Sequence, residues 1–332
     1  MKKKTTTNQQ SKKRFLDYAF AEAERMKLLN RIGVAKNYAN SARQLQKFLA
    51  TLGKKDVTFH RLHNRLLRDF EDWLHQRNVC KNTCSAYMRS LHAIHERAVS
   101  QGLSTGNPFA GIYRGIAKTR KRAIPMTDIR RISTFDVRAA LSDKYREANK
   151  KANGRRFNKM VEKFEFFRDI FVFCFCARGM TFVDLAYLRK ANITAGTITY
   201  NRRKTGQQLH VRLEPIMQQI IDRNPSPSGY LFHILNDGTD AQRTYQMYSS
   251  ALSLYNKTLK ELGNMMRLPL TSYVCRHSWA TAARQQNIPL HIISQSMGHD
   301  NEKTTEIYLK SIEDIRIDQS NRSLLDAVFT TK

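Results

Sequence analysis

Apolar residues recur every three or four positions along most of this chain, which is the spacing of amphipathic helices. In the N-terminal third, three such stretches stand out, at residues 38–52, 62–74 and 82–98. Asn82 is of a type that caps helices, so it is expected to begin the third stretch. The sequence STGNP at residues 104–108 then interrupts the pattern. These stretches therefore predict one small helical bundle.

A second helical region begins near residue 132. Residues 161–176 are almost continuously apolar, which predicts a buried helix, and Gly179 is expected to end it. Thr181 can then cap the next helix, with Asp184 at its third position.

Between residues 197 and 213 the helical period gives way to strict alternation. Ile198, Tyr200, Arg202 and Lys204 alternate with other side chains, which predicts a β-hairpin. Residues two apart in a strand share a face, so Arg202 and Lys204 are expected on the side of the apolar pair. The predicted fold class is mainly α with a small antiparallel β-sheet.

Composition and pattern divide the chain into four parts. They are a basic N-terminal arm (1–28), a small helical domain (29–117), a basic linker (118–131) and a larger, mostly helical domain (132–332). Pro125 and a run of basic residues argue against a helix through the linker. A cationic linker either follows a phosphate backbone or is simply solvated.

The charge balance narrows the class of partner. Lys and Arg number 57 against 28 Asp and Glu, which gives a formal net charge of +29. This excess is far more than solubility requires and favours a nucleic-acid partner, although a solvated basic surface is the alternative. The N-terminal part is the more densely basic, as expected of a module that grips a phosphate backbone.

Nothing in the sequence predicts a membrane or secretory protein. Five cysteines without a C-x-x-C pair favour reduced thiols and give no zinc pattern. The basic N-terminus lacks the apolar segment of a signal peptide, and the longest apolar run, residues 170–177, is too short to span a bilayer. We therefore expect a cytoplasmic protein with no membrane association.

The strongest chemical signal lies between residues 270 and 310. Arg276, His277, His299 and Tyr308 all fall within this stretch. A guanidinium can bind two phosphate oxygens, an imidazole can accept a proton, and a phenol oxygen can attack phosphorus. Together these groups suit covalent attack on a phosphodiester.

These residues resemble the C-terminal motif of the tyrosine recombinase/integrase family. The family's Arg-His-Ser/Thr, Gly-His and Tyr correspond here to residues 276–278 (RHS), residues 298–299 (GH) and Tyr308. The spacing of nine residues from His to Tyr matches, and residues 304–308 (TTEIY) are similar to T-T-x-x-Y. The variants most similar to this pattern are integrases and DNA invertases of Bacteroidetes mobile elements. The resemblance extends over about residues 30–315.

The resemblance implies a helical, SAM-like core-binding domain followed by an α+β catalytic domain. It implies a site-specific DNA recombinase that cleaves and rejoins DNA through a 3′-phosphotyrosyl intermediate, for integration, excision or inversion. Tyr308 would be the nucleophile, Arg276 and His299 would assist at the phosphate, and Lys204 would protonate the departing 5′ oxygen. No metal or other cofactor is implied. The implied partners are double-stranded DNA at recombination sites, a homotetramer in the synaptic complex and accessory DNA-bending proteins.

Two positions depart from the family pattern. The pattern H-x-x-R places histidine where Tyr273 stands, and this tyrosine either donates a hydrogen bond to phosphate or is a buried packing residue. The pattern G-x-R-x-x-[ED]-L places arginine where Thr181 stands. Arg202 or Arg178 must then supply the missing charge, and strand geometry favours Arg202 because it shares a face with Lys204.

Two other functions stay open. One is a type IB topoisomerase-like enzyme, although the helical N-terminal module favours recognition of a site. The other is a DNA-binding protein with altered catalysis, which the departures at Thr181 and Tyr273 would favour. The apolar spacing of residues 311–325 predicts a tail helix. This helix docks either on a neighbouring protomer or on the protomer to which it belongs.

Overall fold

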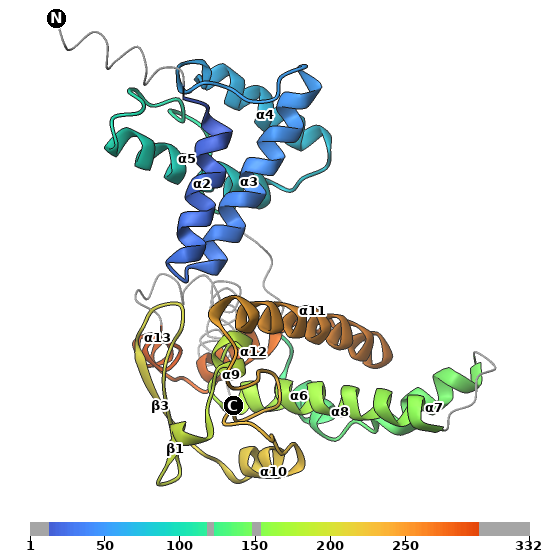
Figure 1. The fold of residues 1–332 in the computed structure, drawn as a ribbon. Coiled ribbons are helices and arrows are strands. Elements are labelled where there is room, and N and C mark those ends of the chain that lie inside the picture. Colours follow the sequence, from blue (N-terminus) through green and yellow to red (C-terminus); the bar gives the residue numbers. More distant parts are fainter. Residues whose placement is uncertain (1–12, 118–122, 148–153, 299–332) are drawn as a thin grey trace, which may run out of the picture. The chain divides into compact units, whose positions relative to one another are not determined.

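The computed structural model describes residues 13–117, 123–147 and 154–298 of the 332-residue chain. The chain divides into two compact units, Met1–Thr119 and Arg120–Lys332. Both units are mostly helical, and a three-stranded antiparallel sheet lies in the second (Figure 1). The predicted fold class, mainly α with a small antiparallel β-sheet, is confirmed.

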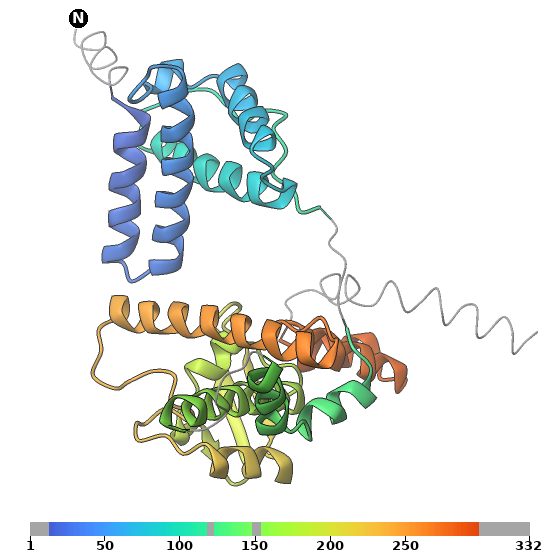
Figure 2. The ribbon, with the colours of Figure 1, turned by 90° about the vertical axis from the view of Figure 1, so that its right-hand side faces the viewer.

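The first unit is a bundle of α-helices. Its elements are α2 (Phe15–Leu28), α3 (Ile32–Thr51), the short 3-10 helix η1 (Phe59–Arg61), α4 (Asn64–Gln76) and α5 (Lys81–Ser100). α2 and α3 form an antiparallel hairpin (Figure 2), and α5 packs against both α3 and α4. Each helix turns its apolar stripe inward, so the core contains fully buried leucine, phenylalanine and methionine side chains.

Residues 15–28 are not part of a basic arm, as the sequence had suggested. They form α2, and Phe15 and Met26 near its two ends are buried in the bundle core. The apolar stripe was hard to recognise because small side chains, Ala19 and Ala23, carry its middle. Residues 1–12 of the predicted arm lie outside the described residues.

Asn82 does not cap α5, because the helix begins one residue earlier with Cys80 at the N-cap. Its amide nitrogen instead donates to the Ala117 carbonyl at 3.1 Å, and its amide oxygen accepts from the Ala117 N–H at 2.7 Å. The Ser85 hydroxyl donates to the Gly115 carbonyl at 2.5 Å. Side chains of α5 therefore fix the path of the chain at the end of the first unit.

The second unit is built around one long apolar helix. It contains α6 (Met126–Ser133), α7 (Val137–Glu147), α8 (Gly154–Cys176), α9 (Phe182–Ala186), η2 (Lys190–Asn192), β1 (Ile193–Thr194), β2 (Thr197–Asn201), β3 (Gln208–Arg212), α10 (Pro215–Arg223), α11 (Ala241–Met266), α12 (Val274–Gln285) and α13 (Leu290–Ser296). The predicted buried helix is the C-terminal part of α8, and α6, α7, α10, α11 and α12 all pack against it. Its buried phenylalanines explain why it can serve as the centre of the unit.

The predicted hairpin is present as β2 and β3, with Ile198 opposite Val211 and Tyr200 opposite Leu209. These four apolar residues face the core, and the alternate residues of the strands are more exposed. A third strand, β1, pairs with β2 but is only two residues long. Two residues are too few to show an alternating pattern, which is why the sequence did not predict β1.

The predicted linker, residues 118–131, ends earlier than expected. Residues 126–131 belong to α6, and its Ile129 and Ile132 are buried in the core of the second unit. Pro125 occupies the N-cap of α6 instead of interrupting a helix, because a helix start does not need the missing N–H. Residues 118–122 lie outside the described residues.

Among the described residues, no helix has the length and hydropathy that a bilayer crossing requires.

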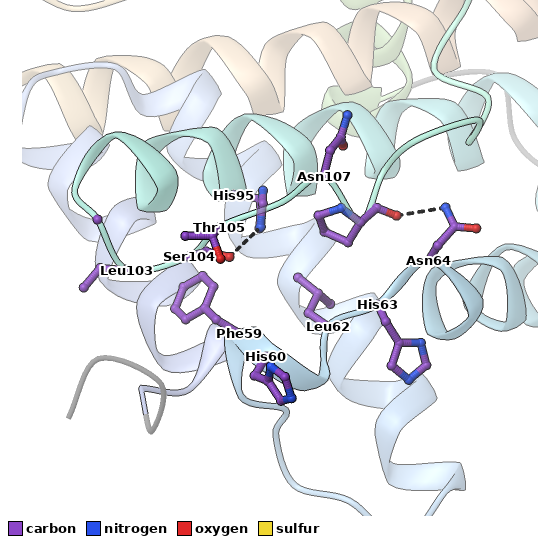
Figure 3. A pocket seen from close by; sticks show the side chains of 12 residues that line it. Phe59, His60, Leu62, His63, Asn64, His95, Leu103, Ser104, Thr105 and Asn107 are labelled. Atoms are coloured by element: carbon purple, nitrogen blue, oxygen red, sulfur yellow. Dashed lines mark hydrogen bonds between the residues drawn. The ribbon is translucent and has the colours of Figure 1, made fainter. Parts of the chain in front are cut away.

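A cavity of about 490 Å³ opens in the first unit, between η1, the start of α4, α5 and the loop that follows α5 (Figure 3). His95 forms part of its wall, is fully buried, and its Nε2 lies 3.0 Å from the Ser104 hydroxyl. The Asn64 amide donates to the carbonyls of Pro108 at 3.0 Å and Ala110 at 2.7 Å. These bonds hold the loop against the start of α4. Burial lowers the pKa of His95; the next largest influence, Glu96, raises it, and the nearby His92 lowers it by a smaller amount.

The lowered pKa of His95 predicts a pH-dependent stability. A histidine in the unfolded chain has a pKa of about 6.5, so below that pH the unfolded chain takes up a proton more readily than the folded one. The stabilisation is complete above this pKa and is lost as the pH falls through the lower folded-state pKa. His95→Gln keeps a donor for Ser104 but does not titrate. Its free energy of unfolding should therefore fall less than that of the wild type between about pH 7 and pH 5, measured by urea denaturation.

His60→Gln is the matched control, because His60 lines the same cavity but is exposed. Equal pH dependence in His95→Gln and the wild type would contradict the assignment. The pKa of His92 is also lowered, by burial and then by Arg114, so part of the pH dependence should persist in the variant.

Candidate active site

Arg276 lies in the first turn of α12 and is only 2% exposed. Its Nη1 donates to the Gly179 carbonyl at 2.8 Å, and its Nη2 donates to the Met297 carbonyl at 2.6 Å. Gly179 follows α8, and Met297 follows α13. One guanidinium therefore joins the ends of two helices that are far apart in the sequence.

Arg202 directly follows β2 and is 5% exposed. It shares the buried face of the hairpin with Ile198 and Tyr200, as the alternation predicted. Its Nη1 donates to the Gly298 carbonyl, which also accepts from the Thr205 hydroxyl at 3.3 Å. Arg202 and Arg276 thus hold two consecutive carbonyls, those of residues 298 and 297.

Two buried guanidiniums beside the same turn repel one another, which is costly away from water unless an anion lies near them. The turn they hold leads directly to His299. His299 and the predicted nucleophile Tyr308 lie outside the described residues. The described part of the site is therefore a paired cationic centre at the carbonyls of Met297 and Gly298, and Gly298 is the glycine of the Gly-His motif.

Thr181 acts as the N-cap of α9, as predicted, and its hydroxyl accepts from the Asp184 N–H at 3.4 Å. The same hydroxyl donates to Asp184 Oδ2 at 2.6 Å. Asp184 is buried, and its Oδ1 accepts from the Arg203 backbone N–H at 2.8 Å. Asp184 therefore connects α9 to the turn between β2 and β3. Sequence reasoning placed Asp184 only within its own helix and missed this second bond.

The Tyr200 phenol lies within the field of the same charged groups. Burial raises the pKa of Tyr200 well above its usual range, and Asp184 raises it further, whereas Arg276 and Arg202 lower it. Tyr200 is therefore a neutral phenol next to the paired arginines at neutral pH.

The other predicted site residues have different environments. Lys204 is exposed in the turn between β2 and β3, so the prediction that it shares the buried face with Arg202 is wrong. The strand alternation does not reach it, because β2 ends at Asn201. Arg178 is half-buried at a left-handed backbone position, φ 57°, just after α8. Tyr273 is the N-cap of α12 and is 51% exposed, so it is not a buried packing residue. Its ring lies 6.1 Å from that of His277, one turn along the helix.

Within the described residues, no cluster of three or more His, Cys, Asp or Glu side chains could hold a metal ion.

Two family models match the chain. The phage integrase SAM-like domain matches residues 14–118, and the phage integrase family matches residues 167–314, which include Arg202, Arg276, His299 and Tyr308. The chain belongs to the tyrosine recombinase/integrase family, as the C-terminal motif predicted.

Curated relatives support the same family over shorter stretches. The tyrosine recombinase XerA of Pyrococcus furiosus is 27% identical over 123 residues, covering 36% of this chain and 41% of the relative. XerA of Thermococcus onnurineus is 31% identical over 71 residues, covering 21% and 25%. The chain thus matches less than half the length of either relative.

Solved structures share the fold at low identity. A lambda integrase dimer bound to a COC′ core site has a TM-score of 0.60 and 12% identity, covering 92% of this chain and 79% of that one. A lambda integrase tetramer bound to a Holliday junction has a TM-score of 0.56 and 12% identity, covering 92% and 80%. The Tn1549 transposon integrase with transposon right end DNA has a TM-score of 0.55 and 13% identity, covering 89% and 94%.

The close approach of Gly179 to Arg276 predicts a stability defect. Gly179 has φ +70°, and a Cβ there would lie 2.9 Å from the Arg276 Cα, a backbone atom that cannot move easily. Gly179→Ala should therefore cost more than the roughly 1–2 kcal/mol of left-handed strain alone, in the free energy of unfolding measured with urea.

Gly196→Ala is the matched control, because Gly196 has the same φ of +70° and a Cβ there would meet no atom within 4 Å. The control should show only the strain. Equal losses in the two variants would mean that Gly179 does not set the position of Arg276.

Proposed function

We propose that this chain is a site-specific DNA recombinase that cleaves and rejoins DNA through a 3′-phosphotyrosyl intermediate. The observation that carries the proposal is the pairing of buried Arg202 and Arg276 at the carbonyls of residues 298 and 297, directly before His299. Two guanidiniums can neutralise the charge that grows on a phosphorus under attack. The match to the family extends through Tyr308 and supports the same function.

In the proposed reaction the Tyr308 oxygen attacks the scissile phosphorus. A new bond forms from phosphorus to that oxygen, and the bond to the 5′ oxygen breaks. His299 accepts the phenol proton or binds the phosphate, and Lys204 gives a proton to the departing 5′ oxygen. Attack by the 5′-hydroxyl of another strand reverses the step. The phosphodiester bond energy is kept in the intermediate, so rejoining consumes no nucleotide.

Arg202 is the proposed substitute for the arginine that the family pattern places at position 181. The Thr181 hydroxyl is already used by Asp184 and carries no charge. Arg202 is buried and its guanidinium reaches the carbonyl next to the one that Arg276 holds. Arg178 is the weaker candidate, because within the described residues its side chain makes no hydrogen bond to either carbonyl. Tyr273, exposed one turn before His277, would donate a hydrogen bond to phosphate.

The proposed partner is double-stranded DNA at specific recombination sites. Net charge of +29 supports a polyanion partner, and the lambda and Tn1549 relatives are described as bound to DNA. A homotetramer at synapsis is proposed by analogy with the lambda integrase tetramer on a Holliday junction. Accessory DNA-bending proteins are proposed as further partners of the complex. The helical first unit would be the core-binding domain, and the predicted tail helix at residues 311–325 lies outside the described residues.

Two alternatives share parts of this site. A DNA-binding protein with altered catalysis is favoured by the uncharged Thr181, and a type IB topoisomerase-like enzyme would use the same nucleophile without strand exchange. Formation of a covalent adduct excludes the first. Reciprocal exchange of strands between two duplexes excludes the second, because a topoisomerase-like enzyme does not exchange strands.

Covalent trapping tests the proposed function. The full chain is incubated with a pool of nicked duplexes, in which the cleaved fragment diffuses away and leaves the protein–DNA adduct. We expect an SDS-stable adduct from the wild type and none from Tyr308→Phe, because phenylalanine has no oxygen to attack phosphorus.

Tyr113→Phe is the matched control, because it removes the same hydroxyl from a tyrosine of the first unit. The phenylalanine ring keeps the contact with the Lys81 ammonium that lies over it. The control should form the adduct. An adduct retained in Tyr308→Phe would show that another residue is the nucleophile, and no adduct from the wild type with any duplex would sink the enzyme proposal.

A further inference from the structure

A ladder of aromatic rings runs from the core of the second unit to its surface. It starts at the fully buried Tyr255 of α11, whose ring stacks on Phe182 of α9 at 4.6 Å and 25°. Phe182 in turn stacks on Tyr248 of α11 at 6.2 Å and 28°. α9 and α11 pack against each other, so the ladder fixes its outer rings on a rigid base.

Three half-buried tyrosines form the outer end of this ladder. The Tyr248 ring lies 6.0 Å from that of Tyr187 and 6.1 Å from that of Tyr245. The guanidinium of Arg203 lies over Tyr187, with its central carbon 3.7 Å from the ring centroid. We call these four residues, Tyr187, Tyr245, Tyr248 and Arg203, the tyrosine platform.

The tyrosine platform borders the candidate active site. Arg203 lies between Arg202 and Lys204 in the chain, and Asp184 holds its backbone N–H. Tyr187 ends the helix that Thr181 begins. The platform therefore starts at the turn that carries the proposed catalytic residues.

Tyr248 of the platform is electrostatically influenced by Tyr273, the N-cap residue of α12. Burial raises the pKa of Tyr248 to about 12, and Tyr273 is the next largest cause. Tyr248 is thus a neutral phenol at physiological pH and does not repel a phosphate chain.

Half-exposed aromatic faces beside a cation are suited to unpaired nucleotides. A base can stack on a tyrosine ring only when it has left the duplex, and each such stack contributes about 1–3 kcal/mol. Arg203 adds attraction for the adjoining phosphates and stiffens Tyr187 through its cation–π contact. A structural role in joining α9 to α11 explains Phe182 and the buried face of Tyr248, but not an exposed arginine over Tyr187.

We propose that the tyrosine platform binds unpaired nucleotides of the cleaved strand next to the break. The inference rests on the proposed function, because cleavage at Tyr308 would free a 5′-hydroxyl end. Holding a few unstacked bases there would keep that end near the phosphotyrosine until it is exchanged.

Photocrosslinking of the full chain tests the platform directly. The probe is a thymidine-rich single strand of about twelve nucleotides with one 5-iododeoxyuridine, mixed with excess unlabelled duplex that occupies double-strand sites. Irradiation joins the iodinated base to an aromatic ring that it stacks on, and mass spectrometry locates the link. We expect links at Tyr187, Tyr245 or Tyr248. Links found only in the first unit, or removed entirely by the duplex, would overturn the proposal.

Matched variants separate stacking from folding and charge. Tyr245→Ala should weaken binding of the single strand about tenfold, measured by fluorescence anisotropy, while Tyr245→Phe should bind as the wild type does. Arg203→Gln should weaken binding more than Arg212→Gln, which removes the same charge at the far end of the hairpin. Unchanged binding in Tyr245→Ala, or equal losses in the two arginine variants, would overturn the proposal.

The binding test is independent of catalysis. Tyr308→Phe should still bind and crosslink the single strand although it forms no adduct. A chain that crosslinks at the platform but never forms an adduct would disprove the recombinase proposal and leave the binding site standing. A chain that forms the adduct but does not crosslink at the platform would disprove the platform and leave the recombinase proposal standing.

Discussion

The placement of two positive charges side by side in a buried position is the constraint on which the rest of the second unit depends. Arg276 and Arg202 come from α12 and from the end of β2, and they meet at the carbonyls of residues 297 and 298. Such a pair is costly without an anion, and a scissile phosphate is an anion of the right charge and shape. Gly298 permits the arrangement, since a Cβ there would lie 3.0 Å from the Arg202 Cδ.

The chain around α8 and α9 positions this pair. α8 supplies the packing centre, and the chain just after it offers the Gly179 carbonyl to Arg276. α9 begins at Thr181, and its Asp184 carboxylate holds the turn that carries Arg203 and Lys204. A carboxylate that bonds to one backbone N–H and one hydroxyl fixes that turn. The same turn carries Arg203 of the tyrosine platform, so catalysis and strand binding would share one support.

Much of this arrangement could be predicted from the sequence where the signal is local. Alternation in the hairpin placed Arg202 on the buried face, and the spacing of Thr181 to Asp184 gave the helix cap correctly. Signals that depend on distant segments were missed, such as the bond from Asp184 to Arg203 and the pairing of Asn82 with Ala117. The helix at residues 15–28 has only a weak sequence signal, because alanine contributes little hydropathy to its apolar stripe. The stacking between rings of α9 and α11 could not be predicted either, because the stacked residues are far apart in the chain.

Cleavage of a neutral phosphate analogue tests the central claim most directly. A methylphosphonate at the scissile position removes the negative charge that Arg202 and Arg276 are proposed to neutralise. Arg202→Ala should fail on the ordinary phosphate and regain adduct formation on the methylphosphonate, because the missing cation is no longer needed. Arg178→Ala should behave as the wild type on the phosphate. Rescue of Arg178→Ala in place of Arg202→Ala, or no rescue of Arg202→Ala at all, would contradict the account.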